Sequence, residues 1–130
     1  MPFPIENQYI ILMENNLKVK FPEKFKQRMM RNNGGELNNY TYEFDLYPFF
    51  DKKNRKRISR TCNHIEQETK RARKWRGFPD NAIAIGSDGC GKQLILIHDG
   101  NGILGEELLI WDHETNKIQQ IAQNINILEK

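Results

Sequence analysis

The stretch from Ala82 to Glu114 holds the residues whose types and spacing are closest to a chemical site. From Gly86 to Lys92 it reads Gly-Ser-Asp-Gly-Cys-Gly-Lys, which fits the first seven positions of a phosphate-binding P-loop. Such a loop needs a Ser or Thr next, to ligate magnesium, and a helix whose free amides hold the phosphates. Here Gln93 follows, and the run to His98 is rich in leucine and isoleucine, as in a strand. The pattern therefore favours a glycine turn between two strands over a nucleotide site.

A second group of residues has the side chains that metal binding or acid–base chemistry would need. It consists of His98, Asp99, Asp112, His113 and Glu114. Imidazoles and carboxylates are common zinc or manganese ligands, but neighbours along a strand point to opposite faces, so His113 would point away from Asp112 and Glu114. We expect a strand end whose acidic side chain caps nearby amides and whose Trp111 lies in the core, with no metal, cofactor or catalytic residue. A metal-dependent hydrolase is the weakest alternative.

The two cysteines do not indicate catalysis or a disulfide framework. Cys62 is expected on the apolar side of a helix, where a thiol behaves as a small hydrophobe. Cys90 lies near Lys92, but nothing fixes a base beside it, and His64 is expected to be a solvated helical residue. Reduced thiols, a start without signal-peptide features and the lack of a membrane-length apolar run favour a cytoplasmic location. A chain of 130 residues is expected to form one domain, residues 1–130, and we expect no enzyme.

Three elements are expected before residue 36. The first is a helix whose apolar face consists of Ile5, Tyr9, Leu12 and Met13. An alternating segment, residues 17–21, follows. Pro22 suits the first turn of a second helix, in which Phe25 and Met29 share a face, and Gly34 and Gly35 are expected to end it.

The middle of the chain is expected to contain one strand and one helix. Residues 40–46 alternate aromatic or apolar with polar side chains, as a half-buried strand does. A basic loop follows, and a third helix is expected from Ser59 or Thr61, either a fair N-cap, to about Lys74. Its apolar positions would be Ile58, Cys62, Ile65 and Ala72.

The last third reads as strands separated by short turns, with Asp-Gly and Asn-Gly signals at residues 99–102. Strands are expected at residues 82–85, 93–98, 108–111 and 118–121, and a short helix at 124–128. The turns are too short for parallel crossovers. The sequence therefore predicts an α+β fold of order α-α-β-α-β-β-β-β-α, with an antiparallel sheet backed by helices on one face.

Three motifs in this order resemble the SUKH superfamily, which includes bacterial immunity proteins of polymorphic toxin systems and fungal regulators of cell-wall synthesis. They lie at residues 21–35, 85–91 and 111–114. The matching residues are Pro22, Gly34, Gly35, Gly86, Asp88, Gly89, Gly91, Trp111, Asp112 and Glu114. The resemblance implies a binding fold with no established active site. Lys92 departs from it, because many relatives have an acidic or amide residue after the last glycine.

The segment from Asp51 to Arg76 is strongly basic. It contains eleven Lys or Arg and three Asp or Glu residues, which gives a net charge of +8. The rest of the chain contains nine Lys or Arg and fourteen Asp or Glu residues, which gives a net charge of −5. Such a cluster is able to neutralise phosphates, and Trp75 to stack a base, although a tryptophan at a helix end more often packs inward. An acidic protein partner is the other physical interpretation.

The family resemblance implies that the partner is a cognate toxin domain, neutralised when this protein occludes its active site. Relatives often use an acidic face against nuclease toxins, which the basic segment here does not match. We expect partner contacts at Lys70, Arg71, Arg73, Lys74 and Lys92. A nucleic-acid-binding module built on residues 52–76 is the alternative function.

Overall fold

The fold comes from a computed structural model that describes residues 4–38 and 43–128. The helices are α1 (Asn7–Leu17), α2 (Glu23–Arg31), α3 (Arg55–Arg60), α4 (Ile65–Ala72) and α5 (Ile125–Leu128). The strands are β1 (Gly35–Asn38), β2 (Glu43–Leu46), β3 (Ala82–Ser87), β4 (Lys92–Ile97), β5 (Leu108–Asp112) and β6 (Ile118–Ala122). Within the described ranges, every helix is too short or too polar to cross a membrane.

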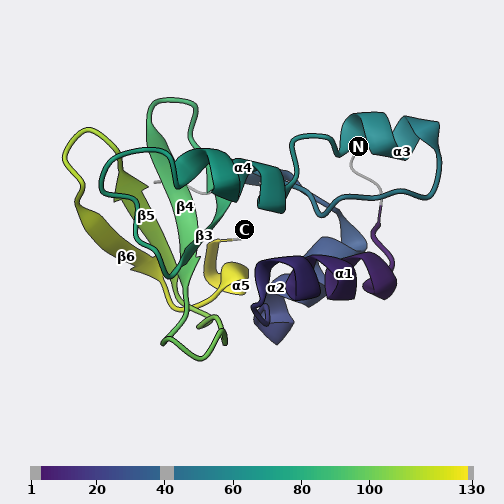
Figure 1. Ribbon diagram of the computed structural model, residues 1–130, viewed down its shortest axis with the longest axis horizontal. Helices are drawn as coiled ribbons and strands as arrows, with labels where there is room; N and C mark the ends of the chain where they lie inside the picture. The colour runs from purple at the N-terminus through teal and green to yellow at the C-terminus, as the bar shows by residue number, and fades with distance from the viewer. Residues whose placement is uncertain (1–3, 39–42, 129–130) are drawn as a thin grey trace.

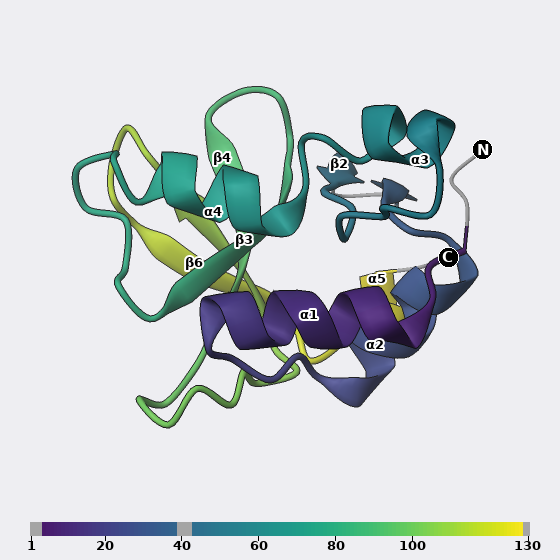
Figure 2. The ribbon, with the colours of Figure 1, turned by 45° about the vertical axis from the view of Figure 1, so that its right-hand side comes forward.

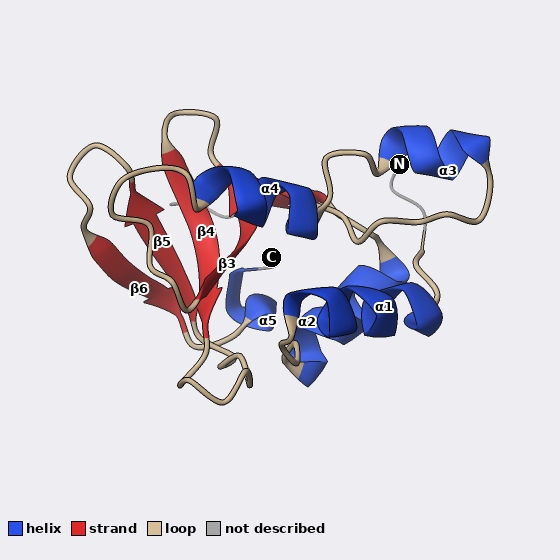
Figure 3. Ribbon diagram, in the orientation of Figure 1, coloured by secondary structure: helices blue, strands red, loops and turns tan. Residues whose placement is uncertain are grey.

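The strands form one antiparallel sheet in which each strand pairs with its neighbour in the chain, in the order β1-β2-β3-β4-β5-β6 (Figures 1 and 3). The α+β class and the antiparallel sheet are thus confirmed, as are strands β3 to β6 and the short helix α5. The register of β3 against β4 shifts between Ala84 and Gly86, as at a β-bulge.

The two faces of the sheet contribute to two different apolar clusters. Ile83 and Ile85 of β3 and Leu94 and Leu96 of β4 pack with side chains of α1, α2 and α5. The alternate positions, Ala82, Ala84, Ile95 and Trp111, pack with Ala72 and Phe78 on the other face. We call these the inner and the outer face. The strict alternation follows from the two-residue period of a strand.

Helix α4 passes from the inner to the outer face instead of lying on the inner face with the other helices. Its first residue, Ile65, belongs to the inner cluster, and its last, Ala72, to the outer one. Figure 2 shows α4 beside β3, with α1 passing below its first residues, where Asn16 donates to Glu66 at 3.3 Å. The expectation that all helices lie on one face is therefore wrong for α4.

The position of α4 is explained by the edge of β3. Strand β2 pairs only with Gly86 and Ser87, which leaves the rest of this edge without a strand. There the buried Thr69 hydroxyl accepts a hydrogen bond from the amide N–H of Ala84 at 3.0 Å. Because a buried N–H without an acceptor is costly, α4 replaces the missing strand at this point.

Several boundaries near the N-terminus differ from those expected. Helix α1 starts after Ile5, and Ile10 rather than Leu12 lies on its buried face, since Leu12 is 40% exposed. Leu17 belongs to α1, not to an extended segment. Helix α2 follows Pro22 as expected, but it ends at Arg31.

Gly34 and Gly35 therefore do not cap α2. They have φ of 93° and 83° and turn the chain into β1, a strand the sequence did not predict. Of the predicted strand 40–46, residues 43–46 are confirmed as β2, and residues 40–42 lie outside the described residues.

The basic segment contains a helix where the sequence predicted a loop. Asn54 accepts a hydrogen bond from the Arg57 amide at 3.0 Å and caps α3. Helix α4 begins at Ile65 with His64 as its N-cap, so neither Ser59 nor Thr61 starts it. Ile58 and Cys62 are exposed and take no part in an apolar face.

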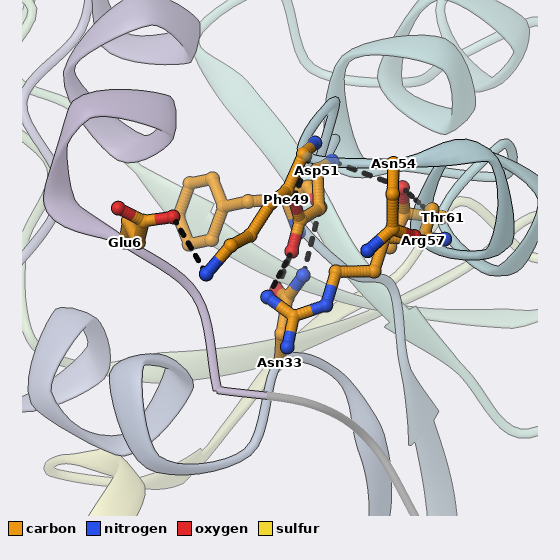
Figure 4. A network of polar contacts seen from close by, with 8 residues as sticks. Glu6, Asn33, Phe49, Asp51, Asn54, Arg57 and Thr61 are labelled. Atoms are coloured by element: carbon orange, nitrogen blue, oxygen red, sulfur yellow. Dashed lines mark hydrogen bonds and ion pairs between the residues drawn. The ribbon is translucent and has the colours of Figure 1, made fainter.

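A buried polar network holds this segment against the rest of the molecule (Figure 4). The Asp51 carboxylate accepts from the Lys53 amide at 3.0 Å and lies 3.4 Å from the Arg57 guanidinium. The Asp51 amide donates to the Thr61 hydroxyl at 2.9 Å. Asn33 exchanges hydrogen bonds of 2.7 and 2.8 Å with the backbone of Phe49. Thr61, expected as a helix start, instead joins α3 to the loop before it.

Candidate binding surface

Three segments meet at one end of the sheet on its outer face. They are residues 73–78 after α4, the β3–β4 turn at 88–91 and the β5–β6 turn at 113–117. The Trp75 ring stacks on Trp111, with centroids 5.8 Å apart and planes at 18°, and lies 5.3 Å from the His113 ring. His113 in turn contacts Gly91. We call the exposed ring of Trp75 and its surroundings the Trp75 surface.

A buried tryptophan supports the exposed one. Trp111 is 0% exposed and meets Phe78 edge to face at 5.1 Å, whereas Trp75 is 41% exposed. The Trp111 indole N–H is buried with no acceptor in the described part of the chain, which costs about 1–3 kcal/mol. The Trp75 ring therefore lies on a fixed apolar base and presents the rest of its surface to solvent.

His113 connects the two turns beside this stack. Its Nδ1 lies 2.8 Å from the carbonyl oxygen of Gly91. A carbonyl only accepts hydrogen bonds, so Nδ1 carries the proton and donates it. Gly91 has φ of 103°, and a Cβ there would lie 2.6 Å from His113 Cε1. The residue must therefore be a glycine for both conformation and space.

The β3–β4 turn is a hairpin, as the sequence predicted. The Asp88 carboxylate accepts from the amides of Cys90 at 2.8 Å and Lys92 at 3.1 Å, and Lys92 begins a strand. There is consequently no helix N-terminus at the P-loop-like sequence. Gly89 has a positive φ of 79°, whereas Gly86 does not; a Cβ on Gly86 would lie 2.9 Å from the Asp45 carbonyl oxygen.

The end of β5 and the turn after it contain the capping acidic side chain and the buried Trp111 that the sequence predicted for residues 111–114. Asp112 accepts a hydrogen bond from the Glu114 amide at 2.9 Å, while Trp111 lies in the core and Glu114 is exposed. His98 and Asp99 cap amides of a different turn. Across residues 4–38 and 43–128, no three His, Cys, Asp or Glu side chains are grouped so as to hold a metal.

The structure divides the five predicted partner-binding residues into three groups. Lys70 pairs with Glu66 at 2.9 Å, and Arg71 with Glu68 at 3.3 Å. Arg73 and Lys74 follow α4 directly and precede Trp75 in the chain.

Lys92 stands apart from the other four residues. It is opposite Asp112 across β4 and β5, and the alternation of strand residues places it on the other face from Trp111. Arg76 follows Trp75 in the chain and is exposed, as Arg73 and Lys74 are. The sequence analysis did not select Arg76.

Tyr47 and Gln93 extend the outer face away from Trp75, and the sequence analysis missed both. The Tyr47 hydroxyl donates to Gln93 Oε1 at 2.9 Å. Burial raises the pKa of Tyr47 above its ordinary value. The alternation of side chains along a strand could have identified Tyr47 from the sequence. Leu46 of β2 points to the inner face, so the next residue, Tyr47, points to the outer face.

A pocket of about 340 Å³ lies elsewhere, between α3 and the start of β1, and includes Asp51, Arg57 and Thr61 in its lining. In the network of Figure 4 the Asp51 carboxylate pairs with the Arg57 guanidinium, and the Thr61 hydroxyl accepts from the Asp51 backbone amide. The polar groups of this pocket therefore hold α3 in place, and the Trp75 surface is the stronger candidate for binding.

The architecture defines an α+β protein with an antiparallel sheet and an aromatic surface preformed on one face. Residues 4–128 match the model of the SMI1/KNR4 family (SUKH-1), and the chain belongs to that family. The resemblance seen in the three sequence motifs is thereby confirmed. No curated relative matches the chain.

Proposed function

We propose that this protein is a cytoplasmic immunity protein that binds a cognate toxin domain of a polymorphic toxin system and covers its active site. It performs no catalysis, and it binds no metal or cofactor. Membership of the SUKH-1 family supports a role of this kind. The observation that carries the proposal is the Trp75 surface, where a half-exposed tryptophan stacks on a buried one.

Such a surface suits binding to a protein. Tryptophan, tyrosine and arginine are the residues most enriched at the energetic centres of protein interfaces. Trp75 loses little freedom on binding, because Trp111 and His113 already fix its ring. Preorganisation of this kind favours a tight complex without a change in fold.

The side chains that suggested chemistry are used by the fold itself. Asp88 and Asp112 satisfy turn amides, and His113 donates to a carbonyl. Cys62 and Cys90 are exposed in separate turns. These contacts support a binding role over an enzymatic one.

Coexpression with a toxin domain encoded by a neighbouring gene tests the proposal. We expect growth to be restored when the protein is produced, and the purified pair to form a stable complex. A toxin domain with its active site inactivated by mutation is the control for expression burden. Continued killing in the presence of the folded protein would count against the immunity role.

A further inference from the structure

We infer that the toxin docks on the Trp75 surface and presents acidic side chains to the three exposed cations that neighbour Trp75 in the chain, Arg73, Lys74 and Arg76. This inference rests on the proposed function and specifies the face and the chemistry of the partner. The positive charge of the basic segment does not by itself identify this face, because the segment also includes α3.

The centre of the surface is apolar and fixed. Trp75 is 41% exposed, its inner side is covered by Trp111, and the His113 ring lies 5.3 Å away. Large aromatic side chains supported in this way lose little conformational entropy when a partner covers them. An apolar side chain of the partner would complete the burial of the Trp75 ring.

The rim of the surface is cationic and uncompensated. Arg73, Lys74 and Arg76 are exposed, and none forms an ion pair with any residue that the structure describes. Lys70 and Arg71, one turn earlier, already pair with Glu66 and Glu68. Three exposed positive charges within two residues of an exposed apolar ring are complementary to an acidic patch that includes an apolar side chain.

The distribution of charge favours an acidic protein over a nucleic acid. A nucleic-acid backbone requires a continuous basic track. Here Glu66 and Glu68 interrupt the cations of α4, and Glu114 lies in the turn that borders the surface. Figures 1 and 2 show α3, with its own cations, at the opposite end of the molecule from the β5–β6 turn. The basic segment is therefore divided into separate patches.

The test measures how the purified toxin domain from the neighbouring gene binds to variants of the full-length protein. Trp75→Ala is expected to weaken binding about 30-fold, because it removes the aromatic side chain at the centre of the interface. The triple variant Arg73→Glu, Lys74→Glu, Arg76→Glu should slow association about tenfold or more and remove most of its salt dependence. The matched control is Lys20→Glu, Lys24→Glu, Arg55→Glu, which changes the net charge equally at exposed positions elsewhere and should leave binding within about twofold.

The outcomes separate this inference from the proposed function. If the unmodified protein neither binds the toxin nor restores growth, the proposed function fails and the inference with it. If it binds but both surface variants bind equally well, or the control is weakened as much as the triple variant, the toxin docks elsewhere. Strong binding of a single-stranded DNA oligonucleotide at low salt that the triple variant abolishes would assign the surface to nucleic acid instead.

Folding of each variant is checked by its thermal unfolding. Should Trp75→Ala prove unfolded, the triple variant decides alone, because its three side chains are exposed and support no part of the core.

Discussion

The inner and outer faces of the sheet are both buried, but they are built from different residues. The inner face of the central strands β3 and β4 consists of leucine and isoleucine packed with side chains of α1, α2 and α5. The outer face has small residues, Ala82 and Ala84, next to α4, and aromatic residues at its far end. The small residues allow α4 to approach the edge of β3, and the aromatic stack extends the outer cluster to the protein surface.

This difference suggests a division of roles. The inner face is closed by helices, so its side chains contribute to stability alone. The outer face is closed at one end by a tryptophan that remains 41% exposed, so the same packing that stabilises the fold also supports a binding surface.

The largest expected effect tests this division directly. Leu94→Ala on the inner face should lower the free energy of unfolding by about 2–5 kcal/mol, because it leaves a cavity at a fully buried position. Trp75→Ala should cost less than about 2 kcal/mol, since much of that ring is already in water. Urea unfolding measures both. Equal losses would remove the distinction between the faces.

The second prediction concerns the edge that α4 covers. Thr69→Val keeps the shape of the side chain but leaves the buried amide of Ala84 without its acceptor, a loss of about 1–3 kcal/mol. Thr69→Ser retains the hydroxyl and is the control. Hydrogen exchange of the Ala84 amide should accelerate in the Val variant and stay slow in the Ser variant; equal rates would contradict this role.

A third comparison separates two glycines of the β3–β4 turn. Gly89 and Gly91 both have positive φ, but a Cβ at Gly89 would meet nothing within 4 Å, while one at Gly91 would meet the His113 ring. Gly89→Ala should therefore lower the free energy of unfolding by about 1 kcal/mol, because only the backbone conformation is strained. Gly91→Ala should lower it by more, on the order of 2–3 kcal/mol, because the new Cβ also clashes with His113. Thermal unfolding measures both. The extra loss should shrink when His113 is also replaced by Ala, and an unchanged difference would place its cause elsewhere.

The smallest expected effect is a pH dependence at the start of α4. His64 Nδ1 accepts from the Gln67 amide at 3.3 Å, which only the unprotonated nitrogen is able to do. Burial lowers the pKa of His64 below its ordinary 6.5. Above pH 6.5 the ring is neutral in the folded and unfolded states, and the cap is fully present.

As the pH falls below 6.5, the unfolded chain binds the proton first, so stability decreases until the folded pKa is passed. The loss should stay below about 1 kcal/mol, the usual contribution of one N-cap. His64→Asn keeps a capping group that does not titrate and should remove this part of the dependence in thermal melts between pH 7.5 and 5. A dependence of the same size in both proteins would assign it to another group.

Strands β3 to β6 were predictable because their pattern is local: apolar runs of strand length lie between glycine and asparagine turns. Helix α3 was not, because none of its residues is buried and it shows no apolar periodicity. Its position depends on the Asn54 cap and the buried Asp51, which a pattern search does not detect. His64 was missed as a cap because the residue types that usually cap helices are Ser, Thr, Asp and Asn.

The candidate surface was predictable only in part. Trp75 and its basic neighbours are visible in the sequence, but their support by Trp111 depends on how two distant segments meet. The pairing of Lys70 and Arg71 with Glu66 and Glu68 follows helical spacing, so it was available from the sequence. The separation of Lys92 from the others depends on the register of β4, which sequence alone leaves open.

The strand order has a consequence for the way the chain reaches this structure. Because each of these strands pairs with its neighbour in the chain, the strands from β3 to β6 are joined by local connections, residues 88–91, 98–107 and 113–117. Low contact order of this kind is associated with rapid folding. Among the described residues, the longest connection between paired strands separates β2 from β3, where α3 and α4 intervene. We therefore expect the β3–β6 meander to form first and the β1–β2 pair to join it in a later, slower step.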